Sequence, residues 1–259
     1  MLLLATLFFF AIFPALRYHP DRDLLKGAKI AHRGLHGFSK DVPENSLRAF
    51  QAAADKGYWI ENDIHLTKDG HVVVFHDDTV DRMCGVSGRV EEMTLAELKT
   101  LRLAGTDQEI PTLQECLDLV DGRVALLIEF KCPTANAAPL CEAANRILEG
   151  YQGKYCIQSF YPPVLGWYRK HRKDICRGQL ATPFYKEAFS RRLAGALLFN
   201  FIGRPDFISY EHKFHRNIFR RLAVKLGAGS LGWTFRTEKD LEARKMDFQG
   251  YIFEGFLPK

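Results

Sequence analysis

Carboxylates at short spacing are the side chains of this sequence most suited to chemistry. Glu61 and Asp63 lie two residues apart inside one apolar run, and Glu129 and Lys131 end another apolar run with the same spacing. Residues two apart share one face of a strand, so each pair points the same way. Converging carboxylates repel one another unless a cation lies between them, and oxygen ligands suit Mg²⁺ or Ca²⁺ better than Zn²⁺. An ordinary network of ion pairs with Lys and Arg is the alternative.

Two histidines and an arginine add further chemistry. His32 and Arg33 follow the apolar segment KIA, and His76 follows the apolar segment VVVF. Imidazoles exchange protons near neutral pH and serve as general acids or bases, although a histidine taken alone is more often a structural residue than a catalyst. Arginine binds phosphate groups through two parallel hydrogen bonds. Arg33 is therefore a candidate for binding an oxyanion.

The elements that must position these residues alternate between strands and helices. After residue 27, helical patterns separate most of eight strand-like segments: AKIAH, YWIENDIHL, ALLIEFK, YCIQSF, CRGQLAT, DFISYEH, SLGWTF and GYIFEGF. Eight strands with crossover helices predict a TIM-type (β/α)8 barrel, and a doubly wound open sheet is the alternative. Polar residues at the C-terminal ends of barrel strands line the mouth of the active site. A barrel would therefore bring the acids and the histidines together.

Residues 68–124 interrupt the alternation. The segment DGHVVVFHDDTVDRM follows the second strand closely, and two short helical patterns, MTLAELKTL and PTLQECLDLV, precede the third strand. No internal repeat and no linker rich in Pro, Gly and Ser marks a second domain. We therefore expect one catalytic domain over residues 28–259, preceded by an N-terminal segment over residues 1–27.

Composition limits the class of protein. The 259 residues are 47% hydrophobic and 26% charged, which is enough to bury a large core. The net charge of +5 is small and spread along the chain, so the sequence does not predict nucleic-acid binding. The six cysteines lack the spacing of metal-binding motifs. We expect mostly reduced thiols in a reducing compartment.

The N-terminal segment is the most apolar part of the sequence. Residues 1–16, MLLLATLFFFAIFPAL, carry no charge and are followed by four basic residues: Arg17, Arg22, Lys26 and Lys29. This length is near the lower limit for a membrane span. We expect an uncleaved membrane anchor, with a cleaved signal peptide and a buried core helix as alternatives. The short length and Pro14 also fit a partly inserted or interfacial segment. Because short basic flanks tend to stay on the cytoplasmic side, the catalytic domain is expected in the cytoplasm.

The order of the motifs resembles that of the glycerophosphodiester phosphodiesterase family. AHRG, PENSLRAFQAAADKGYWIENDIHLTKDGHVVVFHD, IPTLQECLDLV, LLIEFK, IQSF and GWTF follow one another as in that family, from about residue 28 to near the C-terminus. The resemblance implies a TIM-type barrel that hydrolyses glycerophosphodiesters to glycerol 3-phosphate and an alcohol. It also implies one divalent cation, Mg²⁺ or Ca²⁺, as cofactor.

Carried over by position, the resemblance assigns roles to the residues at the centre of the predicted site. It makes Glu61, Asp63 and Glu129 the metal ligands. His32 and His76 become the acid–base pair. In this family the nucleophile is thought to be the glycerol 2-hydroxyl, so that one histidine would deprotonate it while the other protonates the departing alkoxide.

The same resemblance assigns substrate contacts. Arg33 and Lys131 would bind the phosphate, and Glu44 of PENS would orient groups in the site with Asn45 beside it. Trp233 would line the glycerol side of the pocket, although a core aromatic residue explains it nearly as well. The family usually ends in a Thr-Asp-x-Pro run, where this chain has IFEGFLPK, with Glu254 in place of the Asp.

Other functions fit the same sequence features. A lysophospholipase D or a hydrolase of a glycerophosphate polymer could use the same site, and a membrane anchor over residues 1–16 would suit a lipid-derived substrate. A membrane-tethered binding protein without turnover is the alternative from another class. The complete set of two histidines and three acids favours catalysis, since function depends on the site and not on the fold.

Overall fold

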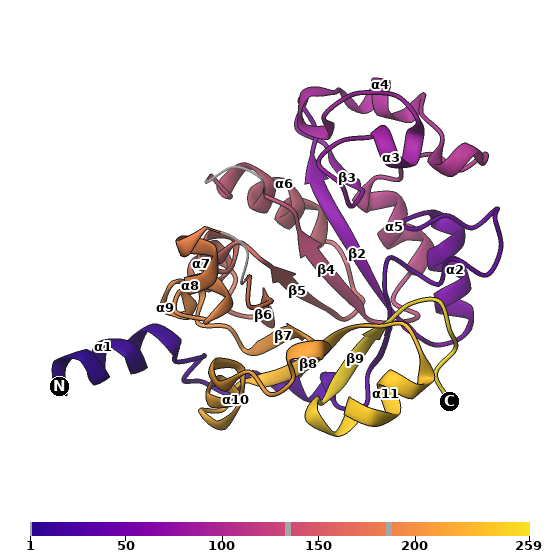
Figure 1. Cartoon of the computed structure of the whole chain (residues 1–259). Helices are drawn as coiled ribbons and strands as arrows, with labels where there is room; N and C mark the ends of the chain where they lie inside the picture. The colour runs from indigo at the N-terminus through magenta and orange to yellow at the C-terminus, as the bar shows by residue number, and fades with distance from the viewer. Residues whose placement is uncertain (1, 133–135, 185–187) are drawn as a thin grey trace. The chain divides into compact units, whose positions relative to one another are not determined.

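The computed structural model of the protein describes residues 2–132, 136–184 and 188–259 (Figure 1). The chain forms two compact units. The first unit comprises residues 30–155 and 254–257, and the second unit comprises residues 1–29, 156–253 and 258–259.

Parallel strands form the centre of the first unit. β2 (Trp59–Leu66) pairs in parallel with β1 (Lys29–Ala31) and with β4 (Leu126–Phe130). All five residues of β4 are buried, which explains its nearly continuous apolar sequence. In the register of β2 and β4, Asp63 lies opposite Glu129. The two predicted acidic segments are therefore neighbours.

The segment between β2 and β4 contains a strand that was not predicted from the sequence. β3 (Val72–Val74) runs antiparallel to β2 and leads directly to His76. This segment has its own cluster of buried apolar side chains: Val73, Phe75, Val80, Met83, Val90, Leu98, Leu103 and Ile110. Burial of each such side chain contributes about 1.5–3 kcal/mol, so the cluster fixes the backbone that carries His76.

Three helices of the first unit, α2, α4 and α5, begin at side-chain caps. Ser46 caps α2 by accepting a hydrogen bond from the N–H of Ala49, and Thr94 and Thr112 form capping boxes with Glu97 and Glu115. The helical elements of this unit are α2 (Leu47–Asp55), α3 (Asp81–Cys84), η2 (Val90–Glu92), α4 (Leu95–Lys99), η3 (Leu103–Gly105), α5 (Leu113–Val120) and α6 (Ala138–Leu148). α2 and α5 pack against each other.

The second unit repeats the pattern of parallel strand and helix. Its strands β5 (Tyr155–Ser159), β6 (Arg177–Ala181), β7 (Phe207–Glu211), β8 (Gly229–Phe235) and β9 (Gly250–Phe253) pair in sequence order. Its helical elements are α1 (Leu2–Ile12), η1 (Pro20–Leu25), α7 (Pro162–His171), α8 (Phe189–Gly195), α9 (Asn200–Gly203), η4 (His212–Phe214), α10 (Ile218–Lys225), α11 (Glu238–Arg244) and η5 (Lys245–Asp247). The segment YKEAFSRRLAGALLF has a helical pattern and precedes β7, and its residues 185–187 lie outside the described residues.

All eight predicted strand segments coincide with strands. Over the described ranges, the eight strands other than β3 run parallel to their partners and alternate with helices, which is the order of a TIM-type (β/α)8 fold. The predicted TIM-type (β/α)8 fold is confirmed, apart from the membrane anchor expected before it.

The N-terminal helix differs from the predicted membrane span. α1 contains 11 residues, whereas a span needs about 20, and it ends at Ile12 because Pro14 disfavours helical backbone in the residue before it. Among the described residues, no helix is both long enough and apolar enough to cross a membrane. The division into residues 1–27 and 28–259 stays a prediction.

The end of α1 is held by α9 of the same unit. The side-chain amide of Asn200 donates a hydrogen bond to the carbonyl of Ile12 at 2.9 Å. Arg204 donates to the carbonyls of Phe10 and Phe13 at 2.9 and 2.7 Å and lies over the Phe10 ring. Residues 10–13 are therefore part of the folded second unit.

Candidate active site

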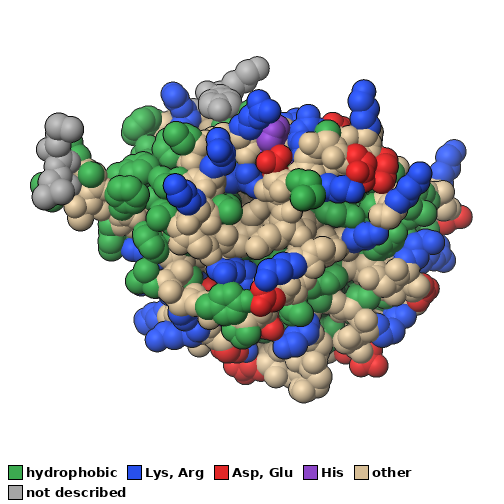
Figure 2. Space-filling view, turned by 90° about the horizontal axis from the view of Figure 1, so that it is seen from below, with side chains coloured by type: hydrophobic (Ala, Val, Ile, Leu, Met, Phe, Trp, Pro, Cys, Tyr) green, Lys and Arg blue, Asp and Glu red, His purple; other side chains and the backbone are tan. Residues whose placement is uncertain are grey.

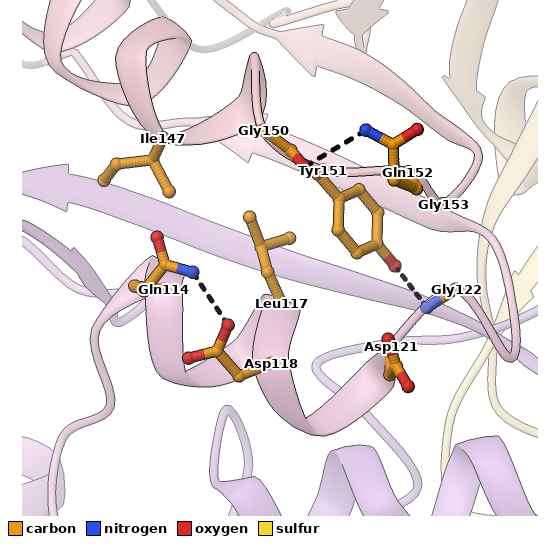
Figure 3. A pocket seen from close by; sticks show the side chains of 10 residues that line it. All are labelled: Gln114, Leu117, Asp118, Asp121, Gly122, Ile147, Gly150, Tyr151, Gln152 and Gly153. Atoms are coloured by element: carbon orange, nitrogen blue, oxygen red, sulfur yellow. Dashed lines mark hydrogen bonds between the residues drawn. The ribbon is translucent and has the colours of Figure 1, made fainter.

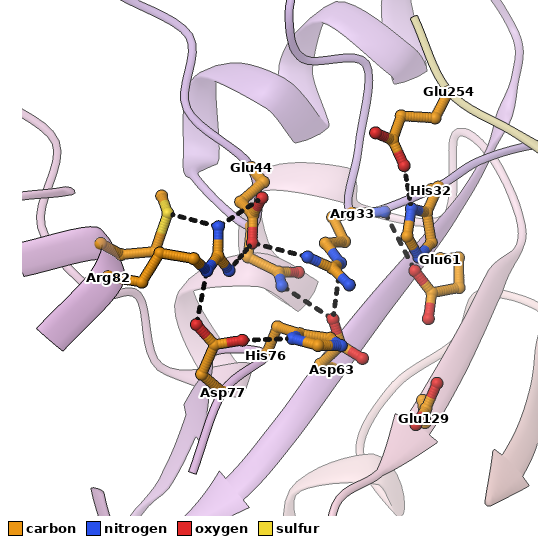
Figure 4. Close-up of polar contacts among 12 residues, drawn as sticks. His32, Arg33, Glu44, Glu61, Asp63, His76, Asp77, Arg82, Glu129 and Glu254 are labelled. Carbon is orange, nitrogen blue, oxygen red and sulfur yellow. Dashed lines mark hydrogen bonds and ion pairs between the residues drawn. The ribbon is translucent and has the colours of Figure 1, made fainter. Parts of the chain in front are cut away.

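Three buried carboxylates of the first unit meet between β2 and β4 (Figure 4). Glu61 and Asp63 come from β2 and Glu129 comes from β4, and one oxygen of each lies within 4.8 Å of the others. Their exposed fractions are 1%, 0% and 5%. The predicted pairing of the two acidic segments is correct, because the parallel register places residues with a two-residue spacing on one side of both strands.

The three acids have unequal ionisation. Burial, together with Asp63 and Glu129, raises the pKa of Glu61 well above its ordinary value. Burial also raises the pKa of Glu129. For Asp63, the effect of burial is outweighed by Lys131, His76 and Arg33, so its pKa is lowered. The cluster is therefore a site in which negative charge is concentrated and incompletely compensated.

Lys131 supplies part of the compensation. Its Nζ lies 3.0 Å from Asp63 and 2.5 Å from Glu129, so the ion network considered from the sequence is present. The carboxylate of Glu61 accepts a hydrogen bond from the backbone N–H of Arg33 at 2.9 Å. Among the described residues, no cationic side chain lies at ion-pair distance from Glu61. The donor set is all oxygen and buried, which fits a hard divalent cation such as Mg²⁺ or Ca²⁺.

Arg33 reaches the acids through an unusual backbone. It has a positive φ of 54°, and its guanidinium donates to Glu44 at 2.8 Å and lies 3.6 Å from Asp63. A Cβ on Gly34 would lie 2.8 Å from the Ala49 backbone, so only glycine fits there. Strained backbone of this kind is concentrated at functional sites. These contacts explain why the arginine is followed by glycine at the end of β1.

The expected binding of a phosphate group by Arg33 can be tested by substitution. Arg33→Lys should lower kcat/KM about 10–100-fold, nearly as much as Arg33→Ala, because an ammonium group cannot make two parallel hydrogen bonds to a phosphate. Steady-state kinetics with a glycerophosphodiester would measure this. Arg48→Lys is the matched control, since Arg48 pairs with Asp107 on the surface of the same unit. An Arg33→Lys enzyme as active as wild type would show that only charge matters at this position.

His76 is held by a chain of ion pairs. Its Nδ1 lies 2.6 Å from Asp77, which also accepts from Arg82 at 2.6 Å, and Arg82 donates to Glu44 at 2.6 Å. Burial lowers the pKa of His76, with Asp63 opposing this effect. Asp77 and Arg82 were not identified from the sequence. The sequence signal for Asp77 is the run HDD, which places a carboxylate directly after His76.

His32 is oriented by a residue far away in sequence. Its Nδ1 lies 2.7 Å from the carboxylate of Glu254, which belongs to the first unit although it follows β9. Burial lowers the pKa of His32, and the hydrogen bond to Glu254 opposes this effect. Both candidate histidines thus have a carboxylate on Nδ1, which leaves Nε2 as the nitrogen for proton transfer. Glu254 stands at the position where the family motif has Asp.

Asn45 and the buried histidine His65 belong to the first unit, and Trp233 belongs to the second. Asn45, which also has a positive φ, donates to Asp63 at 2.9 Å. His65 is fully buried, and burial lowers its pKa to about 4, so it is a neutral packing residue at pH 7. Trp233 lies on β8 in the second unit, where its ring packs edge-on against Phe160. Its predicted contact with the glycerol group stays a prediction.

A pocket of the first unit lies away from these residues (Figure 3). It is formed by α5, the end of α6 and the loops before β4 and β5; the lining side chains include Gln114, Asp118, Asp121 and Tyr151. It lies beside the N-terminal end of β4, whereas Glu129 is near the C-terminal end of that strand. The pocket contains neither histidine nor a cationic side chain, so it is not the candidate active site.

Comparison with known proteins assigns the chain to a family. The model of the glycerophosphoryl diester phosphodiesterase family matches residues 32–253. The chain belongs to this family. The family match covers all three acids, both histidines and Arg33. Members of this family are metal-dependent, in agreement with the acidic cluster.

Individual relatives agree with the family assignment. The chain is 44% identical over 117 residues to a glycerophosphodiester phosphodiesterase of Caldanaerobacter subterraneus, covering 41% of this chain and 46% of the relative. It is 31% identical over 174 residues to human glycerophosphodiester phosphodiesterase 1, covering 62% of this chain and 50% of the relative. The chain thus spans about half the length of the curated relatives it matches.

Solved structures agree with the fold. A phosphodiesterase of Oleispira antarctica, solved with the product sn-glycerol-3-phosphate, superposes with a TM-score of 0.74 at 23% identity, covering 90% of this chain and 94% of that one. A glycerophosphodiester phosphodiesterase of Thermotoga maritima superposes with a TM-score of 0.68 at 25% identity, covering 88% and 94%.

Proposed function

We propose that this chain hydrolyses glycerophosphodiesters to glycerol 3-phosphate and an alcohol. The observation that carries the proposal is the arrangement of the first unit, in which two histidines, each paired with a carboxylate, accompany three acids suited to one divalent cation. The names of the relatives and the product bound to the Oleispira antarctica enzyme support this substrate class.

In the proposed reaction, the acids and the cationic side chains bind the phosphodiester. A divalent cation held by Glu61, Asp63 and Glu129 would neutralise charge on the phosphodiester. Arg33 and Lys131 bind the remaining phosphate oxygens, at the cost of part of their contacts with Glu44 and Asp63.

Proton transfer is assigned to the two histidines. One histidine accepts the proton of the glycerol 2-hydroxyl through Nε2 as this oxygen attacks phosphorus and a cyclic phosphate forms. The other donates a proton to the alkoxide as the old P–O bond breaks, so charge does not build up on the leaving oxygen. Water then opens the cyclic phosphate: the second histidine takes a proton from the water, the first returns its proton to the 2-oxygen, and glycerol 3-phosphate is released. Asp77 and Glu254 keep the rings oriented and stabilise the imidazolium form of each.

A panel of substrates tests the proposal. The full chain is incubated with Mg²⁺ or Ca²⁺ and either glycerophosphodiesters with different alcohol groups or lysophospholipids, and the products are identified by mass spectrometry. We expect glycerol 3-phosphate from the glycerophosphodiesters, at least about tenfold faster than any product from the lysolipids. Lysophosphatidic acid as the main product would instead favour a lysophospholipase D. Binding without any product would favour the non-catalytic alternative.

We also propose that α1 attaches the protein to the cytoplasmic face of a membrane by lying in the lipid interface. Apolar side chains are exposed at the left of Figure 2, over α1; the exposed fractions of Leu3, Leu4, Leu7 and Phe10 are 71%, 72%, 54% and 56%. Such a surface is expected to bury its side chains among lipid acyl chains. Basic residues that follow α1, including Arg17 and Lys26, suit the anionic lipids of the cytoplasmic leaflet.

Vesicle sedimentation measures this attachment. The double variant Leu3→Asp, Leu7→Asp should bind vesicles of mixed neutral and anionic phospholipid at least about tenfold more weakly than wild type, because two apolar side chains no longer enter the lipid. The control is Ile218→Asp, Met246→Asp, which changes two residues of the same unit that are 71% and 90% exposed. Equal binding by both double variants would reject α1 as the attachment site.

A further inference from the structure

A second group of potential metal ligands lies in the first unit beside the acidic cluster. One ligand atom from each of His32, His36 and Glu254 lies within 4.8 Å of the others. None of these residues belongs to the group formed by Glu61, Asp63 and Glu129. The pairing of His32 with Glu254, 2.7 Å apart, is explained by orientation of the catalytic imidazole. The presence of His36 is not explained by that role.

His36 has an unsatisfied nitrogen. Its Nε2 is buried and makes no hydrogen bond to any described residue. A buried polar atom without a partner costs about 1–3 kcal/mol, so such atoms in a folded protein call for an explanation. A metal ion bound to Nε2 would supply one, since a neutral imidazole nitrogen is a common metal ligand.

The chemistry of the ligands distinguishes this group from the acidic cluster. Two imidazole nitrogens and one carboxylate oxygen form a ligand set found in tetrahedral Zn²⁺ sites, with the fourth position open. Mg²⁺ and Ca²⁺ prefer oxygen ligands only. The two groups should therefore select different ions even when both ions are present.

We propose that His32, His36 and Glu254 bind Zn²⁺, and that Zn²⁺ bound there inhibits hydrolysis by occupying the imidazole of His32. Nδ1 is the His32 nitrogen beside Glu254, so the metal would bind Nδ1 and keep a proton on Nε2. Nε2 could then no longer accept a proton, and the ring could no longer take the imidazolium form from which it donates one. The metal also takes Glu254 away from its hydrogen bond with His32. The inhibitory part rests on the proposed function, whereas Zn²⁺ binding does not.

Calorimetric titration tests binding without reference to activity. The full chain is first saturated with Mg²⁺, so that the acidic cluster is occupied, and Zn²⁺ is then added. Wild type should bind one Zn²⁺, and His36→Ala should bind it at least about tenfold more weakly, because one of three ligands is lost. His71→Ala is the matched control, since His71 is an exposed histidine of the same unit, paired with Asp69. Equal Zn²⁺ affinity of wild type and His36→Ala would overturn the site.

Two further measurements establish which side chains hold the Zn²⁺. The cysteines are thiols and not disulfides in the described structure, and cysteine thiolates bind Zn²⁺ readily in other proteins. A spectrum of the Co²⁺-substituted protein with thiolate charge-transfer absorption would therefore reject the proposed ligands. If His36→Ala unfolds at a lower temperature than wild type, the titration is repeated with His36→Gln, whose side chain has nearly the volume of histidine. We expect the same loss of Zn²⁺ affinity from it.

Inhibition is then measured on the same proteins. Without Zn²⁺, His36→Ala should hydrolyse a glycerophosphodiester at the wild-type rate, because His36 takes no part in the proposed reaction. With Zn²⁺ in excess Mg²⁺, wild type should lose activity over the concentration range in which it binds Zn²⁺, and His36→Ala should need at least about tenfold more. Zn²⁺ binding with unchanged turnover would overturn the inhibitory part alone.

Discussion

Glu61→Gln and Glu129→Gln should each lower metal-dependent kcat/KM at least about a thousandfold. Each replacement removes one of three charged oxygen ligands, and a bound divalent cation contributes several kcal/mol of transition-state stabilisation. The same variants should lose most of their affinity for Mg²⁺ or Ca²⁺ in a calorimetric titration. Glu109→Gln is the control, since Glu109 lies on the surface of the same unit near Lys99.

Thermal unfolding separates loss of metal from loss of fold. In excess chelator, Glu61→Gln should unfold no lower than wild type, because burial and the neighbouring acids already disfavour the charged form of Glu61. Added Mg²⁺ or Ca²⁺ should raise the Tm of wild type but not that of the variant, since a ligand stabilises only the state that binds it. A variant with wild-type affinity and activity would remove Glu61 from the metal site.

His32→Ala and His76→Ala should each lower kcat about a hundredfold or more without unfolding the protein. General acid–base groups contribute rate factors of this order, and the apolar cluster beneath His76 does not depend on its imidazole. The wild-type rate should follow a bell-shaped pH profile. Because burial lowers both pKa values, its acidic limb, where the base gains a proton, is expected below the ordinary imidazole value of about 6.5.

Two controls make the histidine result specific. His71→Ala changes an exposed histidine of the same unit and should keep the wild-type kcat. Asp77→Asn keeps the shape of the partner of His76 but removes its charge, so it should lower kcat less than His76→Ala and move one limb of the pH profile. Near-normal kcat in either histidine variant would make that histidine a structural residue.

Local patterns were sufficient to predict the strands and the acidic cluster. Glu61 and Asp63, and likewise Glu129 and Lys131, share one face of a strand by spacing alone, and the buried parallel strands required apolar sequence everywhere else. β3 was missed because three valines in a row have the same appearance in a strand and in a buried loop. Only pairing with β2 distinguishes them.

The residues that orient the histidines could not be found in the same way. Glu254 lies 222 positions from His32, and Arg82 lies 38 positions from Glu44. No periodicity links residues so far apart, and their contact depends on the assembled first unit. α1 is shorter than the membrane span expected over residues 1–16 for a local reason, since Pro14 limits the helix to 11 residues.

One measurement tests most directly whether the metal-dependent site hydrolyses glycerophosphodiesters. Wild-type protein is incubated with a glycerophosphodiester in oxygen-18-labelled water, once with Mg²⁺ or Ca²⁺ and once in excess chelator. The masses of the products are then measured by mass spectrometry. We expect glycerol 3-phosphate that carries the label on its phosphate, an unlabelled alcohol, and turnover only in the presence of the cation. Label in the alcohol, or undiminished turnover in chelator, would contradict the assignment of this site.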